Sequence, residues 1–369
     1  MSANLGWALL VGVIAAIAIV GALVRGIGKD RSRFRALVLV TTALTFCVVV
    51  LGAYVRLSDA GLGCPDWPGC YGHMSPGHAR DHIERAVEEQ GGSHGPVSLP
   101  KAWKEMAHRY LAGFLGLLIL AIAVIAWMRR AAFRQSPLLA SSIVGVVIVQ
   151  STLGAWTVTM LLKPAIVTGH LIGGMSTLAL LAWLYARQTG RPAIGNEDLP
   201  LLAPARIGLA LLILQMILGG WVSTNYAALA CPDLPLCRGE LVPPMDFGNA
   251  FHVVRELGRT AEGALLSNEA LTAIHWLHRL GAIVVAAYLA WLAIRTASLP
   301  GLRTTARTLL ALVVAQFAIG LGNVLFSLPL ALATAHNAGA ALLLITLVVI
   351  NFRLFPCSAV GDSADASKS

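Results

Sequence analysis

Charged residues are scarce in this chain. Asp, Glu, Lys and Arg make up only 12% of its 369 residues, whereas 57% are hydrophobic. Soluble globular domains carry roughly 25% charged residues, so this composition excludes a soluble protein, a disordered chain and a nucleic-acid-binding protein. Six cysteines in so long a chain also exclude a small scaffold held together by disulfides. The composition therefore indicates a membrane protein, and its net charge of +9 has to be interpreted through membrane topology.

Long apolar runs are abundant instead. A membrane-spanning segment needs roughly 20 mostly apolar residues, and it is a helix because only a helix pairs its own backbone groups in lipid. The first run lacks the basic start and cleavage site of a signal peptide, so we expect it to be a retained helix. Nine runs are long enough, at about 5–25, 36–57, 105–128, 138–160, 165–186, 207–226, 271–294, 308–328 and 330–351.

The distribution of Lys and Arg predicts the orientation. With an outer N-terminus, most of the 27 basic residues and few of the 18 acidic residues fall on the inner side. Short basic inner loops are what the positive-inside rule requires. We therefore expect a multi-pass protein of a bacterial inner membrane, with a periplasmic N-terminus and a cytoplasmic C-terminus. The two long loops, about 58–104 and 227–270, then face the periplasm.

The chain contains an internal repeat. The segment from Cys64-Pro65-Asp66 to Cys70 returns as Cys231-Pro232-Asp233 to Cys237, at an offset of 167. With small insertions and deletions, the register continues through three further pairs of motifs: His108-Arg109 and His278-Arg279, Gln150…Gly154 and Gln316…Gly320, and Thr168-x-His170 and Thr334-x-His336. Each unit spans four predicted helices, and an even number gives both units the same orientation.

The predicted fold is therefore an all-α polytopic membrane protein. It consists of two tandem pseudo-symmetric four-helix transmembrane bundles and one extra N-terminal transmembrane helix. We expect the extra helix and a cytoplasmic loop at 1–35, the N-terminal bundle at 36–190, the C-terminal bundle at 205–353, and a disordered cytoplasmic tail at 354–369.

Histidines recur at one depth of the predicted helices. Four of the ten lie one or two turns into helices that descend from the periplasmic surface: His108, His170, His278 and His336. An ionisable residue inside a membrane indicates function, because its burial without a partner is costly. Each bundle contributes two such histidines, and two imidazoles that face each other across a core are the standard axial ligands of a haem iron. A zinc site would need further ligands. Matched depth and repeat pairing favour haem ligands over hydrogen-bonded structural histidines.

Other residues near this surface suit a haem site. Arg56, Arg109 and Arg279 lie at the periplasmic ends of helices, where guanidinium groups could pair with haem propionates. Interfacial arginines that reach the lipid headgroups are an equally good explanation. Glu105 precedes His108 by three residues, where the second unit has His275 before His278. A carboxylate on the same helix face as one haem ligand could accept a proton or orient water, although a helix N-terminus also favours an acidic residue.

Four of the cysteines form two repeat-related pairs in the outer loops, Cys64 with Cys70 and Cys231 with Cys237. The periplasm is oxidising, so each pair is a candidate disulfide. Such a bond could be a staple that closes the loop or a redox-active group. The chain has no C-x-x-C-H segment, which disfavours covalently attached haem.

Over about 36–351 the sequence resembles the haem A synthase family. The resemblance rests on Val55-Arg56-Leu57, Gly61 to Pro68, Glu105-x-x-His108-Arg109, Thr168-Gly169-His170, His275-Trp276-x-His278-Arg279 and Thr334-x-His336-Asn337. It implies oxidation of the C8 methyl group of haem O to a formyl group, by successive hydroxylations, to supply haem A to cytochrome c oxidase.

The resemblance also implies roles for single residues. His108 and His170 would bind the substrate haem O, with Glu105 as the catalytic carboxylate, and His278 and His336 would bind a permanent haem b. The implied partners are haem O, the haem O synthase and assembly factors of cytochrome oxidase, with the lipid bilayer around the chain. A homo-oligomer stays open. The family core has eight helices, so the role of the ninth is not implied.

Two other classes compete with this interpretation. A di-haem b electron-transfer protein, such as a quinol oxidoreductase subunit, would share the four histidines but needs no carboxylate beside one haem. Glu105 and the inequality of the two units favour the enzyme. A transporter usually breaks its helices near the membrane midplane to form a site, whereas the informative residues here lie near one face.

Overall fold

The computed structural model describes residues 3–92, 94–133, 136–189, 200–299 and 301–355, and over this part of the chain it is helical with three isolated bridges. The long helices are α1 (Ala3–Ile27), α2 (Arg31–Leu57), α4 (Leu99–Met128), α6 (Leu138–Thr159), α7 (Pro164–Thr189), α8 (Leu202–Thr224), α10 (Asn268–Ala297), α11 (Arg303–Leu325) and α12 (Leu330–Leu354). Shorter ones are α3 (Arg80–Glu89), α5 (Arg130–Phe133), a 3-10 turn (Ala227–Leu229) and α9 (Phe247–Ala250). The predicted all-α polytopic fold is confirmed: eight described helices can span a membrane, and α1 is a further helix, apolar over Ile17–Ile27.

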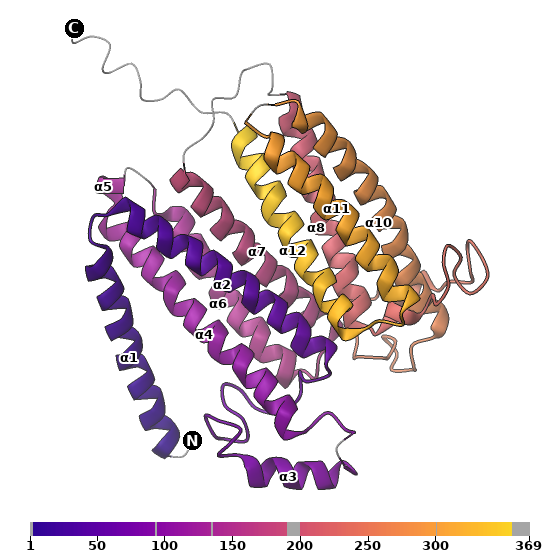
Figure 1. The fold of residues 1–369 in the computed structure, drawn as a ribbon. Coiled ribbons are helices and arrows are strands. Elements are labelled where there is room, and N and C mark those ends of the chain that lie inside the picture. The colour runs from indigo at the N-terminus through magenta and orange to yellow at the C-terminus, as the bar shows by residue number, and fades with distance from the viewer. Residues whose placement is uncertain (1–2, 93, 134–135, 190–199, 300, 356–369) are drawn as a thin grey trace.

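Each repeat unit is a closed ring of four helices. In the first unit α2 packs against α4, α4 against α6, α6 against α7, and α7 against α2. In the second, α8, α10, α11 and α12 follow the same order. The two rings touch mainly through α2, α7, α8 and α12, and they lie side by side in Figure 1. The histidine-bearing helices are therefore diagonal in each ring: α4 faces α7, and α10 faces α12.

Several spanning helices begin before their apolar run because a polar residue caps them. The Ser98 hydroxyl accepts the N–H of Lys101 at the start of α4, and Ser267 accepts that of Ala270 at the start of α10. Asp30 accepts the N–H of Ser32 in the same way before α2. Such caps satisfy backbone donors that a helix leaves unpaired at its start. The helices consequently extend a few residues beyond the predicted apolar limits.

Packed aliphatic clusters fill the end of each bundle that lies away from the histidines. In the first unit the cluster joins the start of α2 to the end of α4 and the start of α6, and in the second it joins the end of α12 to the end of α10. Its fully buried members include Phe34, Ile119, Ile122, Ile143 and Leu181 in the first unit and Leu289, Leu292, Leu309, Leu347 and Ile350 in the second. The histidines lie toward the opposite end of each four-helix bundle.

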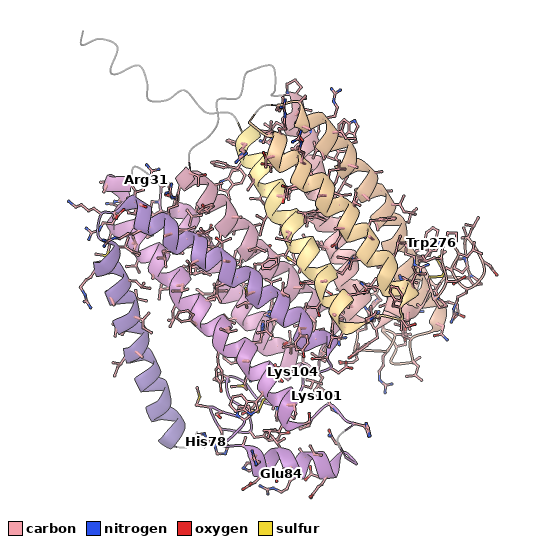
Figure 2. All side chains as sticks on the ribbon, in the orientation of Figure 1. Arg31, His78, Glu84, Lys101, Lys104 and Trp276 are labelled. Atoms are coloured by element: carbon pink, nitrogen blue, oxygen red, sulfur yellow. A yellow bond between two sulfur atoms is a disulfide. The ribbon has the colours of Figure 1, made fainter. Side chains whose placement is uncertain are left out.

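The two long loops that carry the cysteine pairs cover that end of each bundle. In the first loop the amphipathic helix α3 buries Ile83 against Cys64, Cys70 and Met106. Figure 1 shows α3 across the end of the first bundle, at the end of the molecule where α1 begins. In Figure 2 Glu84 lies on α3 and Lys101 and Lys104 lie on the nearby part of α4, whereas Arg31 is at the opposite end of the bundle.

Candidate functional site

The structure brings the four intramembrane histidines together in two pairs. His108 and His170 come from the diagonal helices α4 and α7, and their rings are close enough to interact electrostatically. His278 and His336, from α10 and α12, are paired in the same way. All four residues are only partly buried. Among the described residues, no group of three or more His, Cys, Asp or Glu side chains could hold a metal ion directly.

The Cε1 atom of each histidine ring lies against a glycine of a neighbouring helix. If the glycine carried a Cβ atom, that atom would lie 3.2 Å or less from the ring Cε1, which is closer than ordinary van der Waals contact. The pairs are Gly52 with His108 (2.9 Å), Gly154 with His170 (3.0 Å), Gly219 with His278 (3.0 Å) and Gly320 with His336 (3.2 Å). Only glycine permits this approach without a shift of the ring, so the four glycines set where the imidazoles lie.

Three of the four histidines are also fastened by a glutamine one turn before that glycine. Its side-chain amide donates to the histidine's own main-chain carbonyl. The bonds are Gln150 to His170 (2.7 Å), Gln215 to His278 (2.9 Å) and Gln316 to His336 (3.0 Å). The corresponding residue beside His108 is Val48, which has no polar group to offer.

Glu105 is buried, with 4% of its surface exposed, and has two partners. Its Oε2 accepts the backbone N–H of Cys64 at 3.0 Å, and its Oε1 forms an ion pair with Arg109. His275 takes the same place in the second unit: its Nδ1 accepts the N–H of Cys231 at 3.3 Å, and its Nε2 lies 3.3 Å from Arg279 Nε. Both residues therefore anchor a cysteine loop. Only the first unit does so with a carboxylate, one helical turn from a paired histidine.

Arg109 and Arg279 each donate hydrogen bonds to main-chain carbonyls of one cysteine loop. Arg109 Nη1 donates to the carbonyls of Asp66 (2.8 Å) and Gly69 (2.5 Å). Arg279 donates to the carbonyl of Asp233 at 2.8 Å and to that of Cys231. Most of their donors therefore serve the loops, and their pairing with haem propionates stays a prediction.

Arg56 has a different environment, at the contact between the two units. Its guanidinium donates to the Tyr226 hydroxyl at 2.8 Å and to the Ser223 carbonyl at 3.1 Å. Burial raises the pKa of the Tyr226 phenol, which therefore stays neutral and donates in turn to Asp59 at 3.0 Å. The remaining Arg56 donor, Nε, is buried and has no hydrogen-bond partner.

The cysteines of each outer-loop pair are bonded, Cys64 to Cys70 and Cys231 to Cys237, which confirms the two predicted disulfides. An aspartate closes each loop: Asp66 accepts two backbone N–H groups, and Asp233 accepts those of Arg238 (2.6 Å) and Gly239 (2.8 Å). These N–H groups, above all that of Gly239, lower the pKa of Asp233. The carboxylate thus holds its turn until the pH falls through this lowered pKa.

From the sequence, Gln150 and Gln316 were recognised only as repeat markers, Gln215 was not singled out, and the contacts of all three with the histidines were missed. A signal was present. A Gln-x-x-x-Gly segment occurs on α6, α8 and α11, and a His-x-x-Gly segment occurs on α7, α10 and α12. The second glycine of each pair leaves room for the glutamine, since a Cβ on Gly173, Gly281 or Gly339 would lie within 2.3 Å of its Oε1.

The fold and the site define a class: multi-pass helical membrane proteins whose two repeat-related bundles each hold an opposed pair of histidines. Residues 35–348 match the family model of the cytochrome oxidase assembly protein, and the chain belongs to this family.

Curated relatives agree with this family. The chain is 43% identical over 318 residues to the heme A synthase of Shewanella oneidensis, a match that covers 86% of this chain and 95% of the relative. It is 31% identical to the heme A synthase of Symbiobacterium thermophilum, over 78% of this chain and 84% of the relative. It is 29% identical to that of a Caulobacter strain, over 88% of this chain and 97% of the relative.

Proposed function

We propose that this protein is a haem A synthase, an oxidoreductase that converts the C8 methyl group of haem O to a formyl group for cytochrome c oxidase. The observation that carries the proposal is the pairing of one histidine site with a buried carboxylate, Glu105, and of its repeat copy with an imidazole, His275. An electron-transfer protein with two equal haems has no need of this difference. The relatives named heme A synthase support the same reaction.

The residues present fit two haems. Opposed imidazoles on diagonal helices are the donor set of a bis-histidine haem, and the glycines beside them have no side chain that would displace the rings. His108 and His170 would hold haem O, and His278 and His336 would hold haem b. The bound haems supply the redox chemistry, and the protein supplies ligands, orientation and proton handling.

Glu105 is the proposed catalytic carboxylate. It lies one turn before His108 on α4, on the same helix face, so it would border haem O. From this position it can accept a proton released as the methyl carbon is oxidised, or orient a water molecule. The Arg109 guanidinium and the Cys64 N–H fix its two oxygens.

Arg56 is the best placed of the three arginines to bind a propionate. Its unpartnered buried Nε is a donor that a carboxylate would satisfy, whereas the loops occupy Arg109 and Arg279. Its position at the contact between the units would put that propionate between the two haem sites.

The remaining assignments are part of the same proposal. Residues 36–190 form the unit for haem O, and 205–353 form the unit for haem b. The distribution of Lys and Arg supports a periplasmic N-terminus, with both disulfide loops in the periplasm and a cytoplasmic C-terminus. Haem O synthase would deliver the substrate.

The test compares Glu105→Gln with His275→Gln. Both variants keep a hydrogen-bond acceptor for the cysteine loop, so both should fold and retain haem. Glu105→Gln should lower haem A formation by at least about a hundredfold, the usual effect of losing an acid–base group, and His275→Gln should keep it. Haem A is measured by mass in the pigment extracted from cells that make haem O. Wild-type formation of haem A by Glu105→Gln would contradict the role of this carboxylate.

A further inference from the structure

One histidine of the first unit, His108, lacks a hydrogen bond that the other three have. Gln150, Gln215 and Gln316 fasten the main chain of His170, His278 and His336 to the facing helix. At His108 both residues of this contact are replaced, the glutamine and the glycine three residues after the histidine. Val48 replaces the glutamine, and Leu111 stands where the other sites have the glycine that leaves room for it.

The two replacements belong together. At the other sites the glutamine Oε1 lies over the glycine, within 2.3 Å of where a Cβ would be. A leucine side chain at 111 would therefore collide with a glutamine at 48. The side chain of Val48 is buried and apolar, so it offers the main-chain carbonyl of His108 no hydrogen bond.

His278 is the repeat counterpart of His108, and the two share every other contact described above. Both histidines are followed by an arginine that binds a cysteine loop, and both lie on a helix whose start is capped by a serine. Both rings lie against a glycine, Gly52 or Gly219. The glutamine contact is the feature that His278 has and His108 lacks.

We propose that His108 is the releasable ligand of the substrate site. The first unit then holds its haem with one fastened histidine, His170, whereas the second holds its haem with two. The substrate haem must leave as product in every cycle, and a resident haem must stay. Because the first unit has one glutamine contact and the second has two, haem stays for a shorter time in the first unit than in the second. Val48 and Leu111 are the positioning residues that set the shorter residence time. This inference rests on the proposed assignment of haem O to the first unit.

The experiment measures how fast each haem leaves the purified full-length protein in detergent, with apomyoglobin as the haem acceptor. Chromatography of the remaining pigment identifies which haem has left. Wild type should lose haem in two phases, and the fast phase should carry haem O or its oxidation products. Equal rates for both haems would overturn the proposal.

The double variant Val48→Gln/Leu111→Gly supplies the missing contact and should slow the fast phase by about tenfold, the effect of one or two buried hydrogen bonds. Val48→Gln alone is the matched control, because Leu111 denies the glutamine its place, and it should leave the fast phase unslowed. A double variant with full haem content and an unchanged fast phase would overturn the proposal.

Gln215→Ala provides a second test that needs no repacking at His108. It removes the contact at His278 and should speed the slow phase by about tenfold. The result that would overturn the proposal is an unchanged slow phase. Failure of the proposed function looks different, because wild-type protein supplied with haem O would then form no haem A, whatever the two release rates are.

Discussion

At the scale of single residues, the site depends on what the histidines touch. Their number and depth could be predicted from the sequence, because an ionisable residue inside an apolar run is conspicuous. The contacts of Glu105 with Cys64 and of Gln215 with His278 could not, since they join helices or loops tens of residues apart. Only the repeat hinted at them. The same holds for Arg56, whose partners Ser223 and Tyr226 belong to the other unit.

The glycine beside each ring leads to a prediction at this scale. In Gly154→Ala the new methyl group would lie 3.0 Å from His170 Cε1, so the ring has to move. Overpacking of this kind costs about 1–3 kcal/mol, which corresponds to a loss of about 5- to 150-fold in haem affinity. The measurement is haem bound per chain at limiting haem.

The control lies on the same helix. Gly145→Ala introduces the same methyl group on α6, where no other group lies within 4 Å. It should bind haem as wild type does. Equal haem affinity for Gly154→Ala and Gly145→Ala would show that the glycine does not set the position of His170.

At the scale of elements, apolar runs predicted every spanning helix but not where each one begins. Helix α4 starts at Leu99, six residues before the predicted limit, because Ser98 caps it and its first turns pack beneath the cysteine loop. Helix α3 was not predicted, since its helical pattern is short and lies in a polar loop. It forms where Ile83 can be buried against the Cys64–Cys70 disulfide. Tertiary packing thus decides what the local pattern leaves open.

The second cysteine loop should contribute to stability independently of haem chemistry. The replacement Cys231→Ser/Cys237→Ser opens a short loop that caps the second bundle, and a bond of this span stabilises by about 2 kcal/mol in the chain-entropy model. The thermal unfolding midpoint of the purified protein should fall. Cys47→Ser is the control, because this cysteine is exposed and free, and it should leave the midpoint unchanged. An unchanged midpoint in the double variant would contradict a stapling role.

At the scale of the whole molecule, the two repeat units form similar rings of four helices that differ at two positions near the histidines. The first unit has Glu105 where the second has His275, and Val48 where the second has Gln215. Both differences fall in the first unit, on the two helices that pack beside each other next to His108, α2 and α4. In the proposed assignment, Glu105 supplies a carboxylate for the reaction, and Val48 leaves His108 without the glutamine contact, so that this ligand can exchange. A resident cofactor and a substrate of nearly the same structure can thereby occupy one chain.

The orientation of the molecule can be tested with two single free cysteines in a Cys47→Ser/Cys357→Ser background. Glu84→Cys places a thiol on α3, and Ser32→Cys places one at the opposite end of the bundle; both native side chains are exposed. A membrane-impermeant maleimide added to intact spheroplasts should label the first variant and not the second. Labelling of Ser32→Cys alone would reverse the orientation inferred from Lys and Arg.

The most direct test of the central claim, two unlike haem sites in one chain, is the haem content of the purified protein. Pyridine haemochrome spectra give the amount of each haem, and mass spectrometry of the extracted pigment identifies it. We expect haem b together with haem O, a hydroxylated haem or haem A. Haem b alone, at two per chain and with haem O available in the cells, would contradict it and indicate an electron-transfer protein.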